Sequence, residues 1–177
     1  MADKGGAQRL FFALWPDQAV RKGLLRVSRN LPRHGGRQFH PEDLHITLVF
    51  LGMVEADEYD CVVNAADRVA GRPFRFSIDR VDYWKRPRVL WCGPSETPAA
   101  MTELVQDLQQ ELSACGFEPE KRVYSPHVTL ARKAHPVDAY PLEAPLSWEV
   151  EEFALVVSQG GREPPHYNVL KKWTLDS

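Results

Sequence analysis

A four-residue motif occurs twice in the sequence, and its residue types suit acid–base chemistry. The two copies read His45-Ile46-Thr47-Leu48 and His127-Val128-Thr129-Leu130. On a β-strand, residues i and i+2 point to one face, so each imidazole would share a face with a threonine hydroxyl. A displacement at phosphorus needs a base on the attacking oxygen and an acid on the leaving oxygen. Two histidines across a cleft meet that need, because an unperturbed pKa of about 6.5 lets one be neutral while the other is protonated.

The threonine of each motif would bind the phosphate, and the motif also has non-catalytic interpretations. Thr47 and Thr129 would donate hydrogen bonds to the non-bridging oxygens, where charge develops. Packing in the core would explain a histidine in one copy of the motif. It does not explain two copies, because core packing alone would favour an aliphatic residue at each histidine position. A metal site is less favoured, because no carboxylate or thiolate is placed to complete a coordination shell. A nucleotide-binding module without turnover stays open, although arginine or lysine would serve binding better.

The segments that precede the two motifs repeat one order of predicted elements. Residues 9–15 and 88–94 are short apolar strands that end at a proline, and each is followed by a predicted helix, a loop and the motif. We interpret this order as an internal duplication spanning about 9–84 and 88–175. The chain 1–177 would then form a single two-lobed domain, with 1–8 as a flexible tail.

Apolar periodicity places the remaining elements. It predicts helices over 17–31, 56–70 and 98–115, with Asp17 as the N-cap of the first. It predicts strands over 9–15, 45–51, 74–84, 88–94, 148–158 and 167–175. Residues 134–145 contain three prolines and are predicted to form a mobile loop. Each half of the chain would therefore be a small sheet with helices on its outer face.

The composition is that of a globular protein without a strong overall charge. The 177 residues carry a formal net charge of −2, and the pI is about 6.3. This excludes a large positive field for duplex nucleic acid, whereas binding of one phosphate stays open. The sequence has neither a signal peptide nor an apolar run long enough to span a bilayer, which predicts a cytoplasmic protein without membrane contact. A monomer is the expected state.

The three cysteines are Cys61, Cys92 and Cys115, an odd number without a C-x-x-C spacing. This pattern predicts neither a disulfide framework nor a zinc knuckle. Cys92 and Cys115 have apolar neighbours and are expected to be small core residues.

Five segments, 9–14, 44–52, 88–93, 126–132 and 167–173, occur in an order typical of a known family. They resemble the two-histidine (2H) phosphoesterases, in particular the RNA 2′,3′-cyclic phosphodiesterases, historically called 2′-5′ RNA ligases. The resemblance implies a bilobed α+β fold with two antiparallel sheets flanking a central cleft, helices on the outer faces, and no metal or other cofactor. It implies hydrolysis of an RNA 2′,3′-cyclic phosphate end, or of a cyclic nucleotide, to a 2′-phosphate. His45 would be the general acid and His127 the general base, and 2′-5′ ligation at the same cleft is the alternative reaction.

Further candidates surround the two motifs. Arg132, five residues after His127, resembles the arginine that the family uses against the phosphate or base. Strict strand alternation would turn Arg132 away from His127, unless the strand ends or bulges there. Phe11 is a candidate for stacking on a base, and core packing is an equally supported interpretation. Weaker candidates for the rim of the cleft are Trp84, Arg162 and Tyr167.

Overall fold

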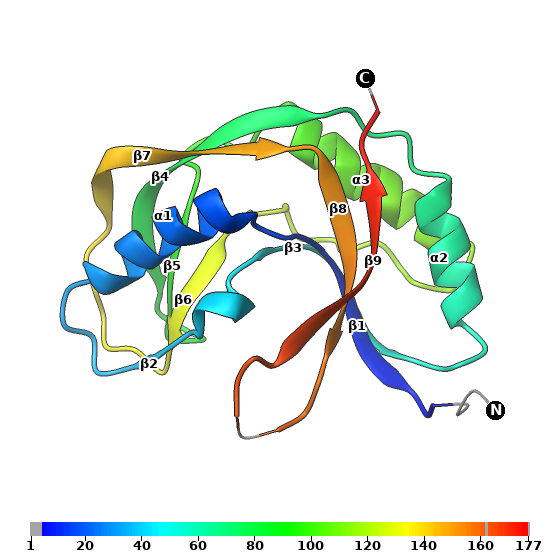
Figure 1. Ribbon diagram of the computed structural model, residues 1–177, viewed down its shortest axis with the longest axis horizontal. Coiled ribbons are helices and arrows are strands. Elements are labelled where there is room, and N and C mark those ends of the chain that lie inside the picture. The colour runs from blue at the N-terminus through cyan, green and yellow to red at the C-terminus, as the bar shows by residue number, and fades with distance from the viewer. Residues whose placement is uncertain (1–4, 162, 177) are drawn as a thin grey trace.

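Antiparallel strands are the main secondary structure of the computed structural model, which describes residues 5–161 and 163–176 (Figure 1). The strands in this part are β1 (Gln8–Leu14), β2 (Arg37–Gln38), β3 (Ile46–Val54), β4 (Phe74–Trp84), β5 (Val89–Gly93), β6 (Val128–Arg132), β7 (Tyr140–Val150), β8 (Glu152–Ser158) and β9 (Tyr167–Thr174). The helices are α1 (Gln18–Arg29), α2 (Tyr59–Asp67), α3 (Ala99–Ser113) and the short 3-10 helix η1 (Pro41–Asp43). The architecture is α+β, as predicted.

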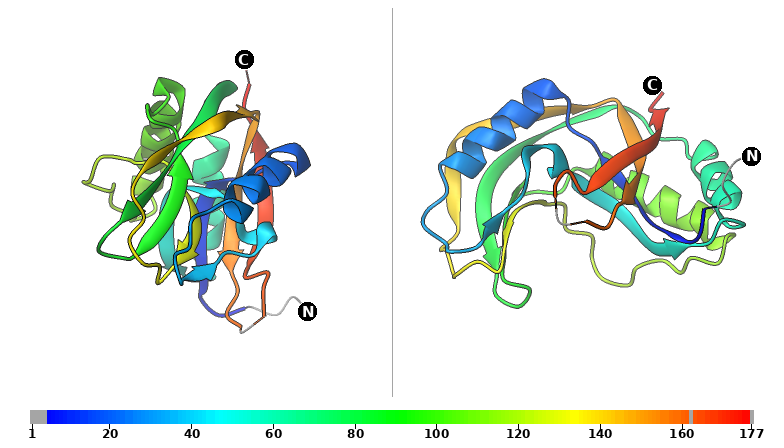
Figure 2. Two further views of the ribbon diagram at one scale, coloured as in Figure 1. Left: turned by 90° about the vertical axis from the view of Figure 1, so that its left-hand side faces the viewer. Right: turned by 60° about the horizontal axis from the view of Figure 1, so that its bottom comes forward.

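The strands form one hydrogen-bonded sheet whose two halves meet at a single residue pair. The order along the sheet is β7-β4-β5-β6-β3-β1-β8-β9, with β2 paired to β6. The pair that joins β3 to β6 is Ile46 with Val128. The structure therefore corrects the expectation of two separate sheets, because the residues that follow the two histidines pair with each other. Figure 2 shows how the sheet curves between the half that contains β4, β5 and β6 and the half that contains β1 and β3.

Each half of the sheet combines strands from both halves of the sequence. β1 pairs with β3, and the equivalent strands β5 and β6 of the second predicted repeat also pair. β8 and β9 extend the sheet beyond β1, whereas β4 and β7 extend it beyond β5. The two predicted repeats thus pair their inner strands in the same way. β4 of the first repeat lies beside β5 of the second, and β8 and β9 of the second repeat lie beyond β1 of the first, whereas β7 stays in the half formed by its own repeat.

The helices lie on one face of the sheet and leave the other face to the histidines. α1 lies against β7, α3 lies against β3, and α2 packs on α3. Leu24 of α1 and Leu104 of α3 belong to the same buried core as Ile46 and Val128. Asp17 caps the first turn of α1 with its side chain, as predicted. None of the described helices is long and apolar enough to cross a membrane.

Several boundaries differ from the prediction. Residues 140–150 form β7 in the region predicted to be a mobile loop, and β7 pairs with β4. β7 is an edge strand, where proline is tolerated because the open edge needs no hydrogen-bond donor. The predicted strand 148–158 is divided at Glu151 into β7 and β8. Gln8, expected in the flexible tail, pairs with Val54 as the first residue of β1.

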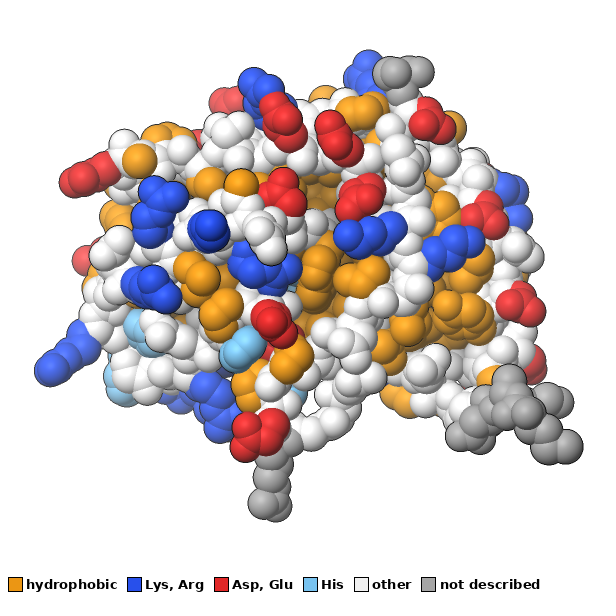
Figure 3. Space-filling model, in the orientation of Figure 1, with side chains coloured by type: hydrophobic (Ala, Val, Ile, Leu, Met, Phe, Trp, Pro, Cys, Tyr) orange, Lys and Arg blue, Asp and Glu red, His pale blue; other side chains and the backbone are white. Residues whose placement is uncertain are grey.

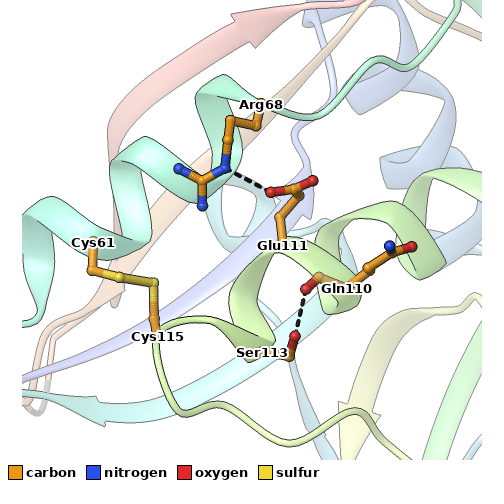
Figure 4. Close-up of a disulfide and its surroundings, with 6 residues drawn as sticks. All are labelled: Cys61, Arg68, Gln110, Glu111, Ser113 and Cys115. Atoms are coloured by element: carbon orange, nitrogen blue, oxygen red, sulfur yellow. Dashed lines mark hydrogen bonds and ion pairs between the residues drawn. A yellow bond between two sulfur atoms is a disulfide. The ribbon is translucent and has the colours of Figure 1, made fainter.

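A disulfide joins the two helices on the β3 side of the molecule. Cys61 of α2 is bonded to Cys115, which follows α3 (Figure 4). An ion pair of 2.6 Å between Arg68 and Glu111 links the same two helices. The prediction for Cys115 is therefore wrong, because the packing of α2 on α3 brings its sulfur to Cys61. Cys92 is buried and free, as expected.

Candidate active site

The pairing of Ile46 with Val128 places the two motifs side by side on one face of the sheet. Both of these side chains are completely buried, whereas the histidines and threonines of the motifs are partly exposed. In an antiparallel pair, the flanking positions also lie opposite each other. Continued by one residue on each side, the register of Ile46 and Val128 sets His45 opposite Thr129 and Thr47 opposite His127. Two imidazoles and two hydroxyls therefore gather on the face away from the helices, which we call the open face.

Both histidines are oriented by the same kind of backbone contact. Nδ1 of His45 donates to the carbonyl oxygen of Asp43 at 2.7 Å, and Nδ1 of His127 donates to that of Ser125 at 2.9 Å. The acceptor lies two residues before the histidine in each case. Because a carbonyl oxygen only accepts, the proton of each neutral ring is on Nδ1, and Nε2 is the free acceptor. Nε2 of His45 accepts a hydrogen bond from the Thr47 hydroxyl at 3.0 Å.

Three aromatic rings surround His45. The Trp15 ring stacks on the imidazole with ring centres 5.5 Å apart and an interplanar angle of 17°. Phe11 lies 5.0 Å from the imidazole, and Tyr167 meets it edge-on at 5.1 Å. Phe11 and Trp15 come from one strand segment, and both rings pack against the imidazole. The rings restrict the rotation of His45 and limit its contact with water.

The surroundings of His127 are also aromatic. Trp84 meets the imidazole edge-on with ring centres 4.4 Å apart, and Trp91 lies 6.2 Å away. Trp84 and Trp91 are themselves in contact at 4.8 Å. The two histidines therefore share a polar backbone anchor and an apolar environment, although different strands supply the rings.

Burial lowers the pKa of both histidines. Desolvation is the main cause of a pKa of about 4 for His45, compared with 6.5 for an unperturbed imidazole. The charges of His127 and Arg132 lower this pKa as well, whereas the hydrogen bond to Asp43 opposes the shift. Desolvation also lowers the pKa of His127, again assisted by the charge of Arg132. Both imidazoles are therefore neutral in the free protein near pH 7.

A β-bulge turns Arg132 toward the open face. Thr129 pairs with Trp91 and Ala131 with Leu90, so Leu130 has no position opposite it on β5. Leu130 and Ala131 are both buried in the core, and Arg132 is exposed. The extra residue reverses the alternation of β6 and returns position 132 to the face of Thr129. The effect of the Arg132 charge on both histidine pKa values agrees with this placement.

Phe11 is near the site but offers little surface. Its side chain is 4% exposed, and its ring packs against His45 and Tyr167. This low exposure fits a supporting role better than base stacking. Trp15 and Tyr167 are partly exposed and belong to the same aromatic group. Arg162 lies outside the described residues.

Asp43, the last residue of η1, holds the segment before the first motif against the start of β9, a role that the sequence did not reveal. Its side chain is 2% exposed. The carboxylate accepts hydrogen bonds from the backbone N–H of His166 at 2.9 Å and of Tyr167 at 3.3 Å, and from Nδ1 of His166 at 3.0 Å. The backbone carbonyl of Asp43 meanwhile anchors His45. An aspartate two residues before the first motif was the available signal, but its partners are more than 120 residues away in the chain.

One hydrogen bond connects the segment before the second motif to the first motif. The Tyr124 hydroxyl donates to the carbonyl oxygen of Thr47 at 2.8 Å.

Trp15 and Trp91 were not recognised in the sequence either, because each follows an apolar strand pattern that core residues share. Within residues 5–161 and 163–176, no group of three or more His, Cys, Asp or Glu side chains is placed to hold a metal ion.

Comparison with known proteins defines the family. Residues 15–162 match the family described as the 2′-5′ RNA ligase superfamily. The chain therefore belongs to the 2′-5′ RNA ligase superfamily, as its residue motifs predicted. It is 32% identical over 172 residues to the RNA 2′,3′-cyclic phosphodiesterase of Escherichia coli, covering 95% of this chain and 97% of that protein. It is 31% identical to the protein of the same name from Thermus thermophilus, covering 94% and 90% of the two chains.

Solved structures show the same fold. The crystal structure of Escherichia coli LigT complexed with 3′-AMP matches with a TM-score of 0.88 and 31% identity, over 97% of this chain and 99% of that one. The structure of TT0787 from Thermus thermophilus matches with a TM-score of 0.80 and 29% identity, over 94% and 97%. The likeness extends over essentially the whole chain, including both motifs.

Proposed function

We propose that this protein hydrolyses RNA 2′,3′-cyclic phosphate ends to 2′-phosphates, with His45 and His127 as the acid–base pair. The relatives of similar length are named RNA 2′,3′-cyclic phosphodiesterases. The observation that carries the proposal is the matched orientation of the two imidazoles. Each is anchored through Nδ1 to the carbonyl oxygen two residues before it, on the same face of adjoining strands.

In the proposed reaction, water attacks the phosphorus of the cyclic phosphodiester and the bond from phosphorus to O3′ breaks. Nε2 of His127 takes a proton from the attacking water, and Nε2 of a protonated His45 gives a proton to O3′. The products are a 2′-phosphate and a 3′-hydroxyl. His127 ends protonated and His45 neutral, so proton exchange with solvent restores the starting state.

Three side chains would stabilise the phosphate as charge builds on its non-bridging oxygens. Thr47 and Thr129 each lie two residues after a histidine on the open face, and the bulge on β6 turns Arg132 to the same face. Donors placed in advance at such positions are typically worth a factor of 10² to 10³ in rate. Thr47 would exchange its present hydrogen bond with Nε2 of His45 for one with the phosphate.

The pKa of His45 places a condition on its role as the acid. A pKa of about 4 leaves it neutral in the free protein, so binding of the anionic phosphate has to raise it. The division of roles follows the family resemblance, and the larger downward shift of His45 in the free protein runs against it. The negative charge of the substrate would raise the pKa of both imidazoles, and the imidazole nearer the phosphate would have the larger rise in pKa.

The substrate class follows from the chemistry of the two histidines. Hydrolysis of a 2′,3′-cyclic phosphate needs only a base for the attacking water and an acid for the leaving O3′, so no protein nucleophile is required. All the proposed side chains come from one chain, so a monomer suffices. The terminal nucleotide would meet the aromatic group around His45, where Trp15 and Tyr167 have partly exposed rings.

The direct test is to incubate the protein with an RNA oligonucleotide that ends in a 2′,3′-cyclic phosphate, in excess chelator. We expect the cyclic end to be converted to a 2′-phosphate. Loss of activity in chelator would contradict the metal-independent mechanism, and a 3′-phosphate product would contradict the assigned leaving group. An unchanged cyclic end would leave only a binding function.

Ligation is the second candidate reaction, and the superfamily description favours retaining it. A 5′-hydroxyl that replaces the attacking water would be deprotonated by the same base and would yield a 2′-5′ linkage. Water is the more abundant nucleophile, so hydrolysis is expected to dominate. Adding a second RNA with a free 5′-hydroxyl to the same assay measures the share of joined product.

A further inference from the structure

Phe50 occupies, in the first motif, the position that Arg132 occupies in the second. Both lie five residues after a histidine. On β3, Ala13 pairs with Thr47 and Phe12 with Val49, so Leu48 has no position opposite it on β1. Leu48 and Leu130 are thus bulged at equivalent places. The bulge on β3 has the same effect as that on β6, and it returns position 50 to the open face.

The partners of Phe50 confirm this orientation. Phe50 lies opposite Phe11, which belongs to the cluster on the open face beside His45. Leu48 is buried in the core, whereas the Phe50 side chain is 60% exposed. The exposed ring lies beside the cluster around His45, so its face is available for stacking on a base.

An arginine lies over the exposed ring. The Arg9 guanidinium carbon is 5.8 Å from the centre of the Phe50 ring. Arg9 pairs with Met53, whose side chain is 58% exposed on the same face. Arg9 and Met53 also line a surface groove of about 500 Å³ that continues to Gln159 and Gly160. Beyond Thr47 the open face therefore carries an exposed ring with a cation over it, and the groove begins at Arg9.

We propose that Phe50 and Arg9 bind the nucleotide that precedes the terminal one, with its base on the Phe50 ring and its phosphate near Arg9. This inference rests on the proposed function and adds a second subsite to it. Three residues of strand separate Thr47 from Phe50 by about 10 Å, which is beyond the terminal sugar and within reach of the neighbouring nucleotide. Aromatic stacking and an arginine are the usual partners of single-stranded RNA.

A different exit for the RNA strand has its own residues. Lys85 and Arg86 are exposed at the tip between β4 and β5, near the second motif. Figure 3 shows that basic and histidine side chains also gather over the side of the molecule that carries α1 and β2. That side offers charge but no exposed aromatic ring of the Phe50 kind among the described residues. The proposed path over Phe50 is therefore favoured, and the other is an outcome of the test.

The test compares substrates of different length. KM is measured for a 2′,3′-cyclic mononucleotide and for a dinucleotide with the same cyclic end, using the intact chain and its Phe50→Ala and Phe50→Trp variants. We expect Phe50→Ala to raise KM for the dinucleotide about tenfold relative to KM for the mononucleotide. Phe50→Trp should restore the ratio. Leu170→Ala removes another exposed apolar side chain, 40% exposed on β9, and is the matched control.

Three outcomes would overturn the subsite. These are equal changes for both substrates, no change for either, or a loss in a Lys85→Ala, Arg86→Ala variant that Phe50→Ala lacks. Anisotropy with a labelled dinucleotide 2′-phosphate gives a second measurement that needs no turnover. If the wild-type protein hydrolyses neither substrate, the proposed function fails. A tenfold weaker binding by Phe50→Ala would still support the subsite in that case, and equal binding would contradict it.

Discussion

Ile46 and Val128 pair with each other across the two halves of the sheet, and each directly follows a histidine. Among the described residues this is the only backbone-paired position of β3 and β6, so the local two-fold relation of the motifs is centred on it. The same register sets the imidazole of one motif across from the hydroxyl of the other. The chemistry proposed for the protein depends on this register.

The roles of the two histidines are separable by a change of leaving group. A substrate with sulfur in place of O3′ releases a thiolate, which needs no proton from the enzyme. We expect His45→Ala to recover most of its lost activity on that substrate, because only the general acid becomes dispensable. His127→Ala should remain inactive on it. The reverse pattern of rescue would exchange the two roles, and rescue of neither variant would remove acid catalysis from this pair.

The pKa of His45 predicts a pH-dependent stability. Its pKa in the folded protein is about 4, below the ordinary 6.5, so the folded state resists protonation. The free energy of unfolding has its full value, as far as His45 is concerned, above pH 6.5. It falls as the pH decreases toward 4, because between these pH values only the unfolded chain binds a proton at His45. The loss is up to about 3 kcal/mol. Urea unfolding of the wild type and of His45→Asn at several pH values measures it.

In that comparison, the stability advantage of the wild type over His45→Asn should shrink as the pH falls. Titration of other groups is common to both proteins and cancels in the difference. A difference that stays constant from neutral to acidic pH would show that burial does not depress the pKa of His45.

Arg132→Gln should affect both the rate and its pH dependence. Removing a donor to the phosphate is expected to lower kcat/KM about 10²-fold. The Arg132 charge lowers the pKa of both histidines, so its removal should raise them and move the acidic limb of the pH profile to higher pH. Arg37→Gln is the matched control, because Arg37 lies opposite Arg132 on β2. A shift of the acidic limb that is equally large in Arg37→Gln would make the effect one of general surface charge.

The disulfide predicts a redox effect on stability that spares the site. Cys61 and Cys115 are separated by 54 residues, and reduction would free that loop in the unfolded chain. We expect the free energy of unfolding to fall by about 2–4 kcal/mol in reductant. The histidines lie on the opposite face of the sheet, so kcat below the unfolding transition should not change. Cys61→Ser should show the same stability with and without reductant, and a reductant effect in that variant would have another origin.

The parts of the site that depend on local sequence patterns could be predicted. The two motifs, their strands and the first helix with its Asp17 cap follow from alternation and periodicity. The direction of the Arg132 side chain could not be predicted in this way. A single bulged leucine reverses the strand alternation, and no residue type in the sequence indicates the bulge. The aromatic surroundings of each histidine and the Asp43 contact with β9 depend on segments far apart in the chain.

The fold was also predictable only in part. The order of strands, helices and motifs indicated two similar halves. It did not indicate that β4 joins the half of the sheet formed by the second repeat, or that β8 and β9 join the half formed by the first. Prolines in 134–145 suggested a loop, although an edge strand accepts them. The Cys61–Cys115 bond required knowledge that α2 packs on α3, which no spacing along the chain supplies.

In the proposed mechanism, two histidines perform acid–base catalysis on a 2′,3′-cyclic phosphate. The most direct measurement is single-turnover hydrolysis of an RNA 2′,3′-cyclic phosphate end by the wild type, His45→Ala and His127→Ala, with folding checked by circular dichroism. We predict that each folded variant is slower by a factor of about 10² to 10⁴ and that the product of the wild type is the 2′-phosphate. A folded His127→Ala variant with near wild-type turnover would contradict the two-histidine mechanism.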